Sequence, residues 1–271
     1  MKILDLFPVV YSSGFSDAIK DRLELGHLLS QQTGGHVQLS VETLDFGPLS
    51  LEGEFDQILA APFIIEKARL AELNGYSAVV IDCFGDPGLS GARELLKIPV
   101  VGANQASVCL AAQLGNRFSI INTTPQTQGI IWNLAARYGV LERLASVKNL
   151  NIAVLEIEKD PIRTVKVATK CIASAVEKDG VDTIIFGCTG MSSIIHKIHA
   201  ALLDMSIIVS LIEPTRTAVY TAISMGLQGV SHSKSAFMSP RRKVRILPKD
   251  LQYLTSTNTA KEKEMERILK R

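Results

Sequence analysis

Short apolar runs rich in β-branched residues alternate with longer stretches of helical periodicity along most of the chain, and this alternation constrains the fold more than any other feature. It is typical of parallel α/β units, in which a helix crosses over between neighbouring strands. Most of the runs are continuously apolar, which indicates strands that are buried on both faces. We predict strands at residues 2–7, 37–44, 78–82, 99–101, 117–121, 152–156, 183–187 and 206–209, and amphipathic helices at 16–30, 54–73, 126–138, 161–177 and 192–203.

The two halves of the chain repeat one pattern. In each half a buried strand ends at a cysteine, Cys83 or Cys188, and leads into a glycine-containing turn, a helix, a second short strand and another helix. The repeat predicts an α/β fold of two similar lobes that face each other, each with a parallel sheet and each contributing one of the two cysteines. Because ligands of such sheets bind at the carboxyl ends of the strands, we expect the active site in the cleft between the lobes. We assign residues 1–103 and about 209–240 to the first lobe, 104–208 to the second lobe and 241–271 to a basic C-terminal tail.

The composition excludes several classes of protein. Hydrophobic residues make up 46% of the 271 residues, which is ample for a packed core. No apolar run approaches the roughly 18 residues of a membrane-spanning helix, and Asp5 and Pro8 interrupt any signal-peptide core. We therefore expect a cytoplasmic protein without a membrane partner. A single tryptophan and 6% aromatic residues leave little for stacking on nucleic acid, so we expect no nucleic-acid partner either.

The net charge of +2 is unevenly distributed along the chain. Residues 240–271 contain ten Lys and Arg residues against four Asp and Glu residues. Such a segment could attract an anionic partner, but it lacks interleaved aromatic residues and the rest of the chain is acidic. We favour a solvated tail, or a contact within a homo-oligomer, with a final charged helix at residues 260–270.

Two of the four cysteines lie where a thiol can do chemistry. Cys83 and Cys188 each end a predicted strand just before a helix, where backbone N–H groups and the helix dipole lower a thiol pKa from about 8.5 toward neutrality. Two thiols on opposite walls of one cleft can take a proton from one face of a carbon α to a carbonyl and return a proton to the other face. The turn amides after each cysteine could then stabilise the enolate oxygen. Cys109 and Cys171 fall in the middle of predicted helices, so we interpret them as structural.

The residues around both cysteines resemble a known family. Residues 83–89 (CFGDPGL), followed by Ala92, Arg93 and Glu94, resemble the first-cysteine signature of the hydantoin and allantoin racemase branch of the aspartate/glutamate racemase superfamily, and residues 187–191 (GCTGM) are similar to its second-cysteine signature. Residues 47–52 with Asp56, and Ser233 with Lys234, also fit. The resemblance implies a fold of two Rossmann-like lobes with parallel sheets related by pseudo-twofold symmetry and the active site between them. It also implies Cys83 and Cys188 as the two catalytic bases, a small-molecule substrate, and no need for pyridoxal phosphate, metal or another cofactor. It further implies substrate-binding roles for Pro8, Phe84, Gly85, Thr123, Thr124, Thr189, Gly190 and Lys234.

Some of these residues also have structural interpretations. Thr123 and Thr124 precede Pro125 and could simply cap a helix. Lys234 could be an exposed loop lysine. We expect Asp82 to point away from Cys83 by strand alternation, and Asp86 to cap the turn at Pro87.

Three positions depart from the pattern of the branch. Residues 7–9 read Phe-Pro-Val where Asn-Pro-Asn is usual, Gln105 stands where Glu is usual, and Ser210, at the end of the predicted eighth strand, stands where Asp is common. The chemistry is therefore expected to persist while the substrate differs. The leading prediction is a cofactor-independent racemase of a small hydantoin, allantoin or related amide or amino-acid derivative. The alternatives are a decarboxylase or cis–trans isomerase of the same superfamily, or a non-catalytic sensor of a small ligand.

Overall fold

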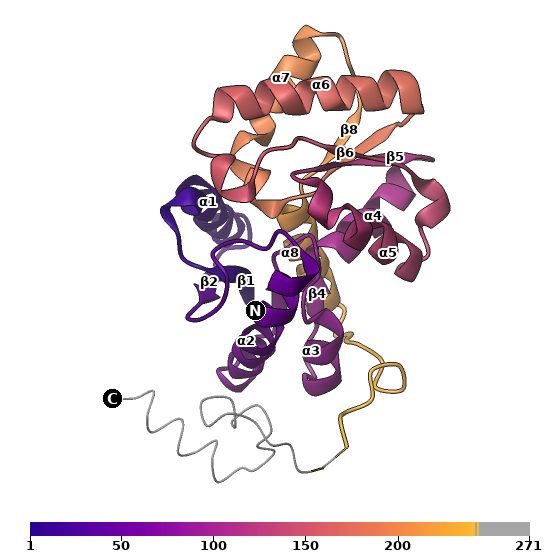
Figure 1. Ribbon diagram of the computed structural model, residues 1–271. Helices are drawn as coiled ribbons and strands as arrows, with labels where there is room; N and C mark the ends of the chain where they lie inside the picture. The colour runs from indigo at the N-terminus through magenta and orange to yellow at the C-terminus, as the bar shows by residue number, and fades with distance from the viewer. Residues whose placement is uncertain (242, 244–271) are drawn as a thin grey trace.

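The computed structural model describes residues 1–241 and 243, which form two lobes, each built on a four-stranded parallel sheet (Figure 1). The strand order is β2-β1-β3-β4 in the first sheet and β6-β5-β7-β8 in the second, so the two lobes repeat one topology. The predicted two-lobe α/β fold is confirmed. The strands are β1 (Lys2–Val10), β2 (Gln38–Leu44), β3 (Ala78–Ile81), β4 (Val100–Gly102), β5 (Phe118–Asn122), β6 (Leu144–Asn149), β7 (Thr183–Phe186) and β8 (Ser210–Ile212).

Helices cover both faces of each sheet. They are α1 (Ser16–Gln32), α2 (Glu54–Leu73), α3 (Leu89–Leu95), α4 (Ala103–Leu114), α5 (Gln128–Arg137), α6 (Pro161–Asp179), α7 (Ile195–Asp204) and α8 (Pro214–Leu227), with short 3-10 turns that include Val154–Glu156 and Thr189–Ile194. None of the helices in the described part of the chain is both long and apolar enough to span a membrane. The charged helix predicted at residues 260–270 lies outside the described residues.

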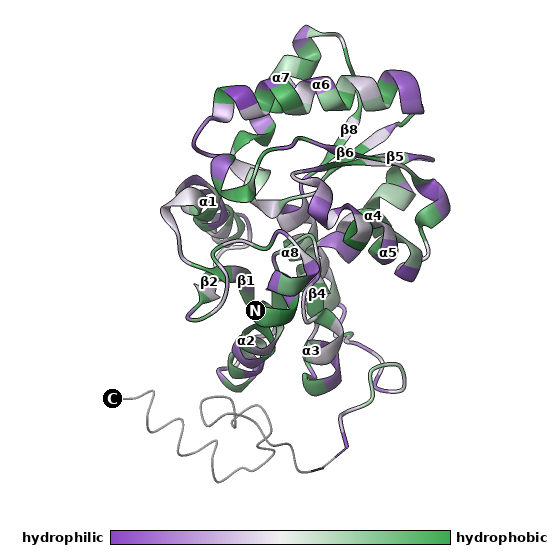
Figure 2. Ribbon diagram, viewed as in Figure 1, coloured by the Kyte–Doolittle hydropathy of each residue, from purple (hydrophilic) through white to green (hydrophobic). Residues whose placement is uncertain are grey.

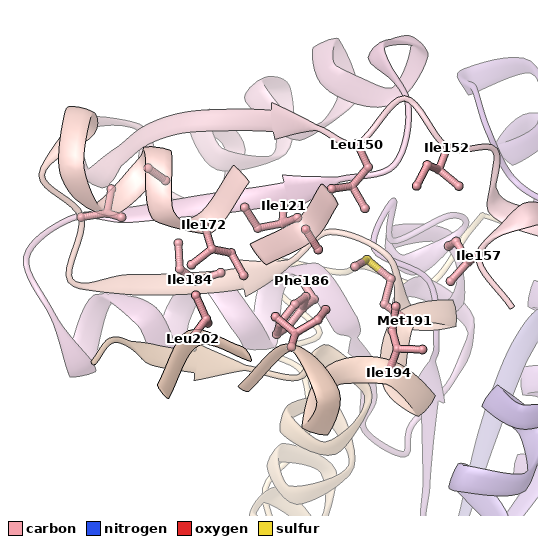
Figure 3. Packing of buried hydrophobic residues seen from close by; sticks show 14 residues of the cluster. Ile121, Leu150, Ile152, Ile157, Ile172, Ile184, Phe186, Met191, Ile194 and Leu202 are labelled. Atoms are coloured by element: carbon pink, nitrogen blue, oxygen red, sulfur yellow. The ribbon is translucent and has the colours of Figure 1, made fainter. Parts of the chain in front are cut away.

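The alternating faces of the strands build a core on each side of each sheet. In β3, Val79 and Ile81 pack against α2 and α3, whereas Ala78 and Val80 pack against α1 and α8. The second lobe follows the same principle, with α6 and α7 on one face and α4 and α5 on the other. Figure 3 shows the α6 and α7 side of that lobe, where fourteen buried residues interlock. Purple and green residues lie side by side along the covering helices in Figure 2, as in amphipathic helices.

The strand predicted at residues 152–156 is wrong. The corresponding strand is β6 (Leu144–Asn149), an edge strand that pairs only with β5, so its solvent-facing positions are polar and it lacks a continuous apolar run. The apolar residues that follow it form a loop instead. Asn151 has a positive φ of 55°, and Val154–Glu156 is a 3-10 turn, yet Ile152 and Val154 are buried in the core.

The strand predicted at residues 206–209 is also displaced. Ser206 adopts a positive φ of 58° in the turn after α7, and the Ile208 side chain is 90% exposed, so β8 begins only at Ser210. The strand therefore ends with Ile212 and is followed by a buried acid, Glu213, so Ser210 does not stand at the strand end. Strand β8 pairs with β7 and belongs to the second sheet, although we had placed residues from about 209 in the first lobe. The chain returns to the first lobe only with α8, which packs on β3 and β4.

Candidate active site

A narrow cavity of about 50 Å³ lies between the two lobes and is open to both cysteines. Cys83 enters it from the turn after β3 and Cys188 from the turn after β7, which are equivalent strands of the two sheets. Of the residues that we predicted to bind substrate, those that line the cavity are Pro8, Phe84, Gly85, Thr123, Thr189 and Gly190.

Two of the predicted substrate-binding residues do not line the cavity. The Lys234 ammonium group donates hydrogen bonds to the carbonyl oxygens of Arg93 (2.7 Å) and Leu96 (2.5 Å), so it caps the C-terminal end of α3 instead of closing on the cleft. The Thr124 hydroxyl is buried without a hydrogen-bond partner, and the backbone carbonyl of Thr124 accepts from Asn122 Nδ2 at 2.6 Å. Thr124 therefore lies behind the wall of the cavity.

Several lining residues were not predicted from the sequence. Among the polar lining residues, Asn122 and Thr127 meet through a 3.0 Å hydrogen bond from the threonine hydroxyl to Asn122 Oδ1. Asn122 ends β5, so the rule that ligands bind at strand ends could have identified it. Among the apolar lining residues, no local motif marks five that come from four separate segments. They are Phe7, Val9, Phe15, Leu51 and Val154.

Glycines bring the turns close to the thiols. The Gly85 N–H donates to Cys83 Sγ at 3.5 Å, and a β-carbon at Gly85 would lie only 2.1 Å from Gln57 Nε2. A larger residue at Gly85 would therefore push Gln57 out of the cavity wall. The Gly190 backbone likewise forms a hydrogen bond that favours the Cys188 thiolate.

The prediction that the strand-end position lowers both thiol pKa values is wrong. Both side chains keep only partial exposure, and their sulfur atoms lie deep between the lobes. Burial raises the pKa of Cys188 to about 11, although the Gly190 amide and the Arg22 charge oppose the rise. Burial raises the pKa of Cys83 still further, and the Cys188 and Asp86 charges add to that rise. Desolvation thus outweighs the helix dipole, and both groups are thiols at neutral pH in the closed cavity.

Asp82 lines the cavity and also bonds behind it. Its carboxylate forms a short contact with the Arg22 guanidinium and accepts a 2.8 Å hydrogen bond from the Thr215 hydroxyl. Its backbone carbonyl accepts from the Thr189 hydroxyl at 3.0 Å, so Asp82 links the turn of one cysteine to that of the other.

Asp86 joins the lobes at a second point. It does not merely close the turn at Pro87, because its carboxylate accepts from the backbone N–H groups of Asn104 (2.9 Å) and Gln105 (3.0 Å) at the start of α4. The Tyr138 hydroxyl of the second lobe also donates to it at 2.7 Å. Burial raises the pKa of Asp86 to about 6, against the opposing effect of these hydrogen bonds.

Metal ligands are not gathered at this site. Within residues 1–241 and 243, no three His, Cys, Asp or Glu side chains are arranged to hold a metal ion. The cavity wall thus combines two thiols, amide and hydroxyl groups, and many apolar side chains, while the Asp82 carboxylate is bonded to Arg22 and Thr215. Such a wall suits proton transfer to and from a small, partly apolar molecule.

Comparison with known proteins identifies the family of the chain. Residues 24–222 match the family described as Asp/Glu/Hydantoin racemase. The chain is 37% identical to the hydantoin racemase of Rhizobium meliloti over 166 residues, which cover 61% of this chain and 69% of that protein. It is 33% identical to the hydantoin racemase of Paenarthrobacter aurescens over 199 residues, which cover 73% and 82%.

Solved structures give the same result. The allantoin racemase from Klebsiella pneumoniae superposes with a TM-score of 0.81 at 26% sequence identity, covering 93% of this chain and 98% of that chain. The allantoin racemase of Pseudomonas fluorescens superposes equally well, with 27% identity and coverage of 91% and 100%. The chain therefore belongs to the Asp/Glu/hydantoin racemase family and is an isomerase of the racemase type.

Proposed function

We propose that the protein racemises a small hydantoin-type ring, without a cofactor, and that Cys83 and Cys188 are its two bases. The observation that carries the proposal is that both thiols open onto one cavity from equivalent strand ends of the two lobes. Their charges are close enough to influence each other, since ionised Cys188 raises the pKa of Cys83. A two-base exchange requires that the pair holds one proton, so that one group is a thiol while the other is a thiolate.

In the proposed reaction, one cysteine is a thiolate and the other a thiol. The thiolate takes the proton from the carbon α to the ring carbonyl, and the electron pair of the C–H bond moves onto the carbonyl oxygen to give an enolate. The thiol on the opposite wall then donates its proton to the other face of that carbon as the enolate collapses. The product is the mirror-image molecule, and the two cysteines have exchanged protonation states.

The residues that line the cavity indicate which substituent the ring carries. Asn122, Thr123 and Thr127 can face the polar edge of a cyclic amide. Phe7, Val9, Phe15, Leu51 and Val154 have no hydrogen-bonding side chain to offer a ureido group, and they outnumber Gln57, whose amide also lines the cavity. We therefore propose a hydantoin with a small apolar substituent rather than allantoin.

The substrate is tested by loss of optical rotation. Enantiopure hydantoins with isopropyl or isobutyl substituents should lose rotation much faster than allantoin at equal enzyme concentration, after subtraction of the spontaneous rate. A faster reaction with allantoin would overturn the apolar assignment and leave the two-base mechanism standing. No reaction with any of these compounds would count against hydantoin-type rings.

The mechanism is tested with the single variants Cys83→Ser and Cys188→Ser in D₂O. Each should lose racemisation, yet each retains one base and should exchange the α-proton of one enantiomer for deuterium with retained configuration. The two variants should prefer opposite enantiomers, because the two thiols face opposite sides. Racemisation near the parent rate in either variant would refute the paired mechanism. Loss of CO₂ from a malonate-type acid in place of exchange would favour the decarboxylase reading.

A further inference from the structure

Arg22 lies behind the cavity and bonds to both cysteine-bearing turns. This residue of α1 is fully buried, although arginine is rarely so. Its Nε pairs with the carboxylate of Asp82, the residue immediately before Cys83. Its Nη2 donates to the carbonyl oxygen of Thr189, the residue immediately after Cys188, at 2.9 Å. One guanidinium group therefore touches a direct chain neighbour of each thiol.

Further hydrogen bonds join Arg22, Asp82 and Thr215 into one network. Arg22 Nη2 also donates to the Thr215 hydroxyl at 3.2 Å, and that hydroxyl donates to Asp82 Oδ1 at 2.8 Å. Arg22 Nη1 donates to the Ala18 carbonyl (2.6 Å) and to the Ser192 hydroxyl (3.2 Å). The guanidinium carbon lies 4.6 Å from the centre of the Phe7 ring, which itself lines the cavity. A planar group with five donors suits such a site, and an ammonium group does not.

The charges around Arg22 are unequal. Acidic groups face it from β1 (Asp5), from the turn after β3 (Asp82), from the start of α8 (Glu213), and from Glu158, which caps the start of α1. Burial raises the pKa of Asp5, Glu158 and Glu213, which favours their neutral forms. Among these acidic groups, the Asp82 carboxylate is the one that bonds directly to Arg22, beside the turn of Cys83.

We propose that Arg22 is a positioning residue for the reaction: it fixes the Cys83 and Cys188 turns against each other across the cavity and places its positive charge on the Cys188 side. This inference rests on the proposed two-base function. Arg22 does not line the cavity, so it acts through the turns and not by touching the substrate.

The two thiols differ in the charges that act on them. The Arg22 charge lowers the pKa of Cys188 against the effect of burial, whereas the Asp82 carboxylate raises the pKa of both thiols. Cys188 therefore ionises at a lower pH than Cys83.

The experiment compares three variants with the parent enzyme. Arg22→Lys keeps the charge but cannot bond Asp82, Thr189 and Thr215 together, so kcat should fall roughly 100-fold with KM changed less than about threefold. Asp82→Asn removes a negative charge, so at pH 8 iodoacetamide should alkylate Cys188 roughly tenfold faster, as followed by peptide mass mapping. Arg22→Met removes the positive charge, so the same alkylation should be roughly tenfold slower.

Arg93→Met is the matched control. Arg93 is also a buried arginine that donates to a backbone carbonyl, that of Val100, and lies over an aromatic ring, that of Phe237. Its charge acts on Asp86, which lies in the Cys83 turn and not in the Cys188 turn. The Arg93→Met variant should unfold at a lower temperature than the parent, while the alkylation rate of its Cys188 stays at the parent value. Rate shifts of opposite sign in the two charge variants are not explained by a merely structural role.

Two results would overturn the inference. One is a parent kcat in Arg22→Lys, and the other is an unchanged or slower alkylation of Cys188 in Asp82→Asn. If Arg22→Met does not fold, Asp82→Asn decides, because the asparagine keeps an acceptor for the guanidinium. Failure of this inference is separate from failure of the proposed function: in the first case the cysteine variants still lose racemisation, whereas in the second they retain it.

Discussion

At the scale of single residues, the proposed mechanism makes the reaction rate depend on the ionisation of the two buried thiols. With a pKa of about 11, the Cys188 thiolate is a small fraction at neutral pH and grows about tenfold with each pH unit. We therefore expect kcat/KM to rise about tenfold per unit from pH 7 toward pH 10, until the fold or the substrate fails. Initial rates corrected for spontaneous racemisation provide the measurement. A plateau below pH 8 would show that the productive thiolate forms at a much lower pH than the closed cavity allows.

Cys109, the exposed cysteine, provides a second prediction at this scale. Cys109 lies on α4 and is exposed, whereas Cys83 and Cys188 are only partly exposed within a narrow cavity. A bulky maleimide at pH 7 should therefore modify Cys109 first and leave racemisation intact, although partial burial also raises the Cys109 pKa. Mass mapping and activity are followed together, with Cys109→Ser as the control that takes up no early label. Loss of activity in step with the first label would contradict the prediction.

At the scale of elements, Lys234 stabilises the end of a helix. Its ammonium group bonds to carbonyl oxygens in the last turn of α3, where a positive charge also complements the helix dipole. Lys234→Met should lower the free energy of unfolding by about 0.5–1 kcal/mol and leave kcat and KM unchanged. Lys97→Met is the matched control, since that lysine side chain is exposed next to the same helix. A clear rise in KM for Lys234→Met but not for Lys97→Met would show that Lys234 takes part in substrate binding.

The elements that could be predicted from the sequence are those whose own residues determine them. Strands β3 and β7 are buried on both faces and have continuous apolar runs, and α2 spans 54–73 as its periodicity predicts. The edge strand β6 lacks such a run, so a neighbouring apolar loop was taken for it. The Arg22 network joins α1, the two cysteine turns and α8, and no local pattern reveals contacts between segments so distant in sequence. The desolvation of the thiols could not be predicted from the sequence either, because it depends on how the two lobes pack against each other.

At the scale of the whole molecule, Asp86 ties the lobes together in a pH-dependent way. Its folded-state pKa of about 6 lies above the ordinary value of 3.8, so between these values the native state holds a proton that the unfolded chain has lost. Stability from this group is therefore full below about pH 4 and declines as pH rises through about 6, by roughly 3 kcal/mol at most.

The variant Asp86→Asn should lack that decline. The difference in unfolding free energy between parent and variant, from urea denaturation at pH 4.5 and pH 7, isolates the Asp86 contribution because the other raised acids, such as Glu213, are common to both proteins. The parent should lose more stability between the two pH values than the variant does. Equal changes in the two proteins would show that Asp86 is not protonated in the native state in this range.

The unequal surroundings of the two thiols have a kinetic consequence, within a limit that thermodynamics sets. Mirror-image molecules have equal free energy in water, so the equilibrium constant between them is one. The Haldane relation then makes kcat/KM identical for the two enantiomers, however differently the two walls of the cavity are lined. The separate values of kcat and KM remain free to differ, and the unequal ionisation of the two thiols favours such a difference. One enantiomer should therefore saturate the enzyme at a lower concentration and turn over more slowly by the same factor.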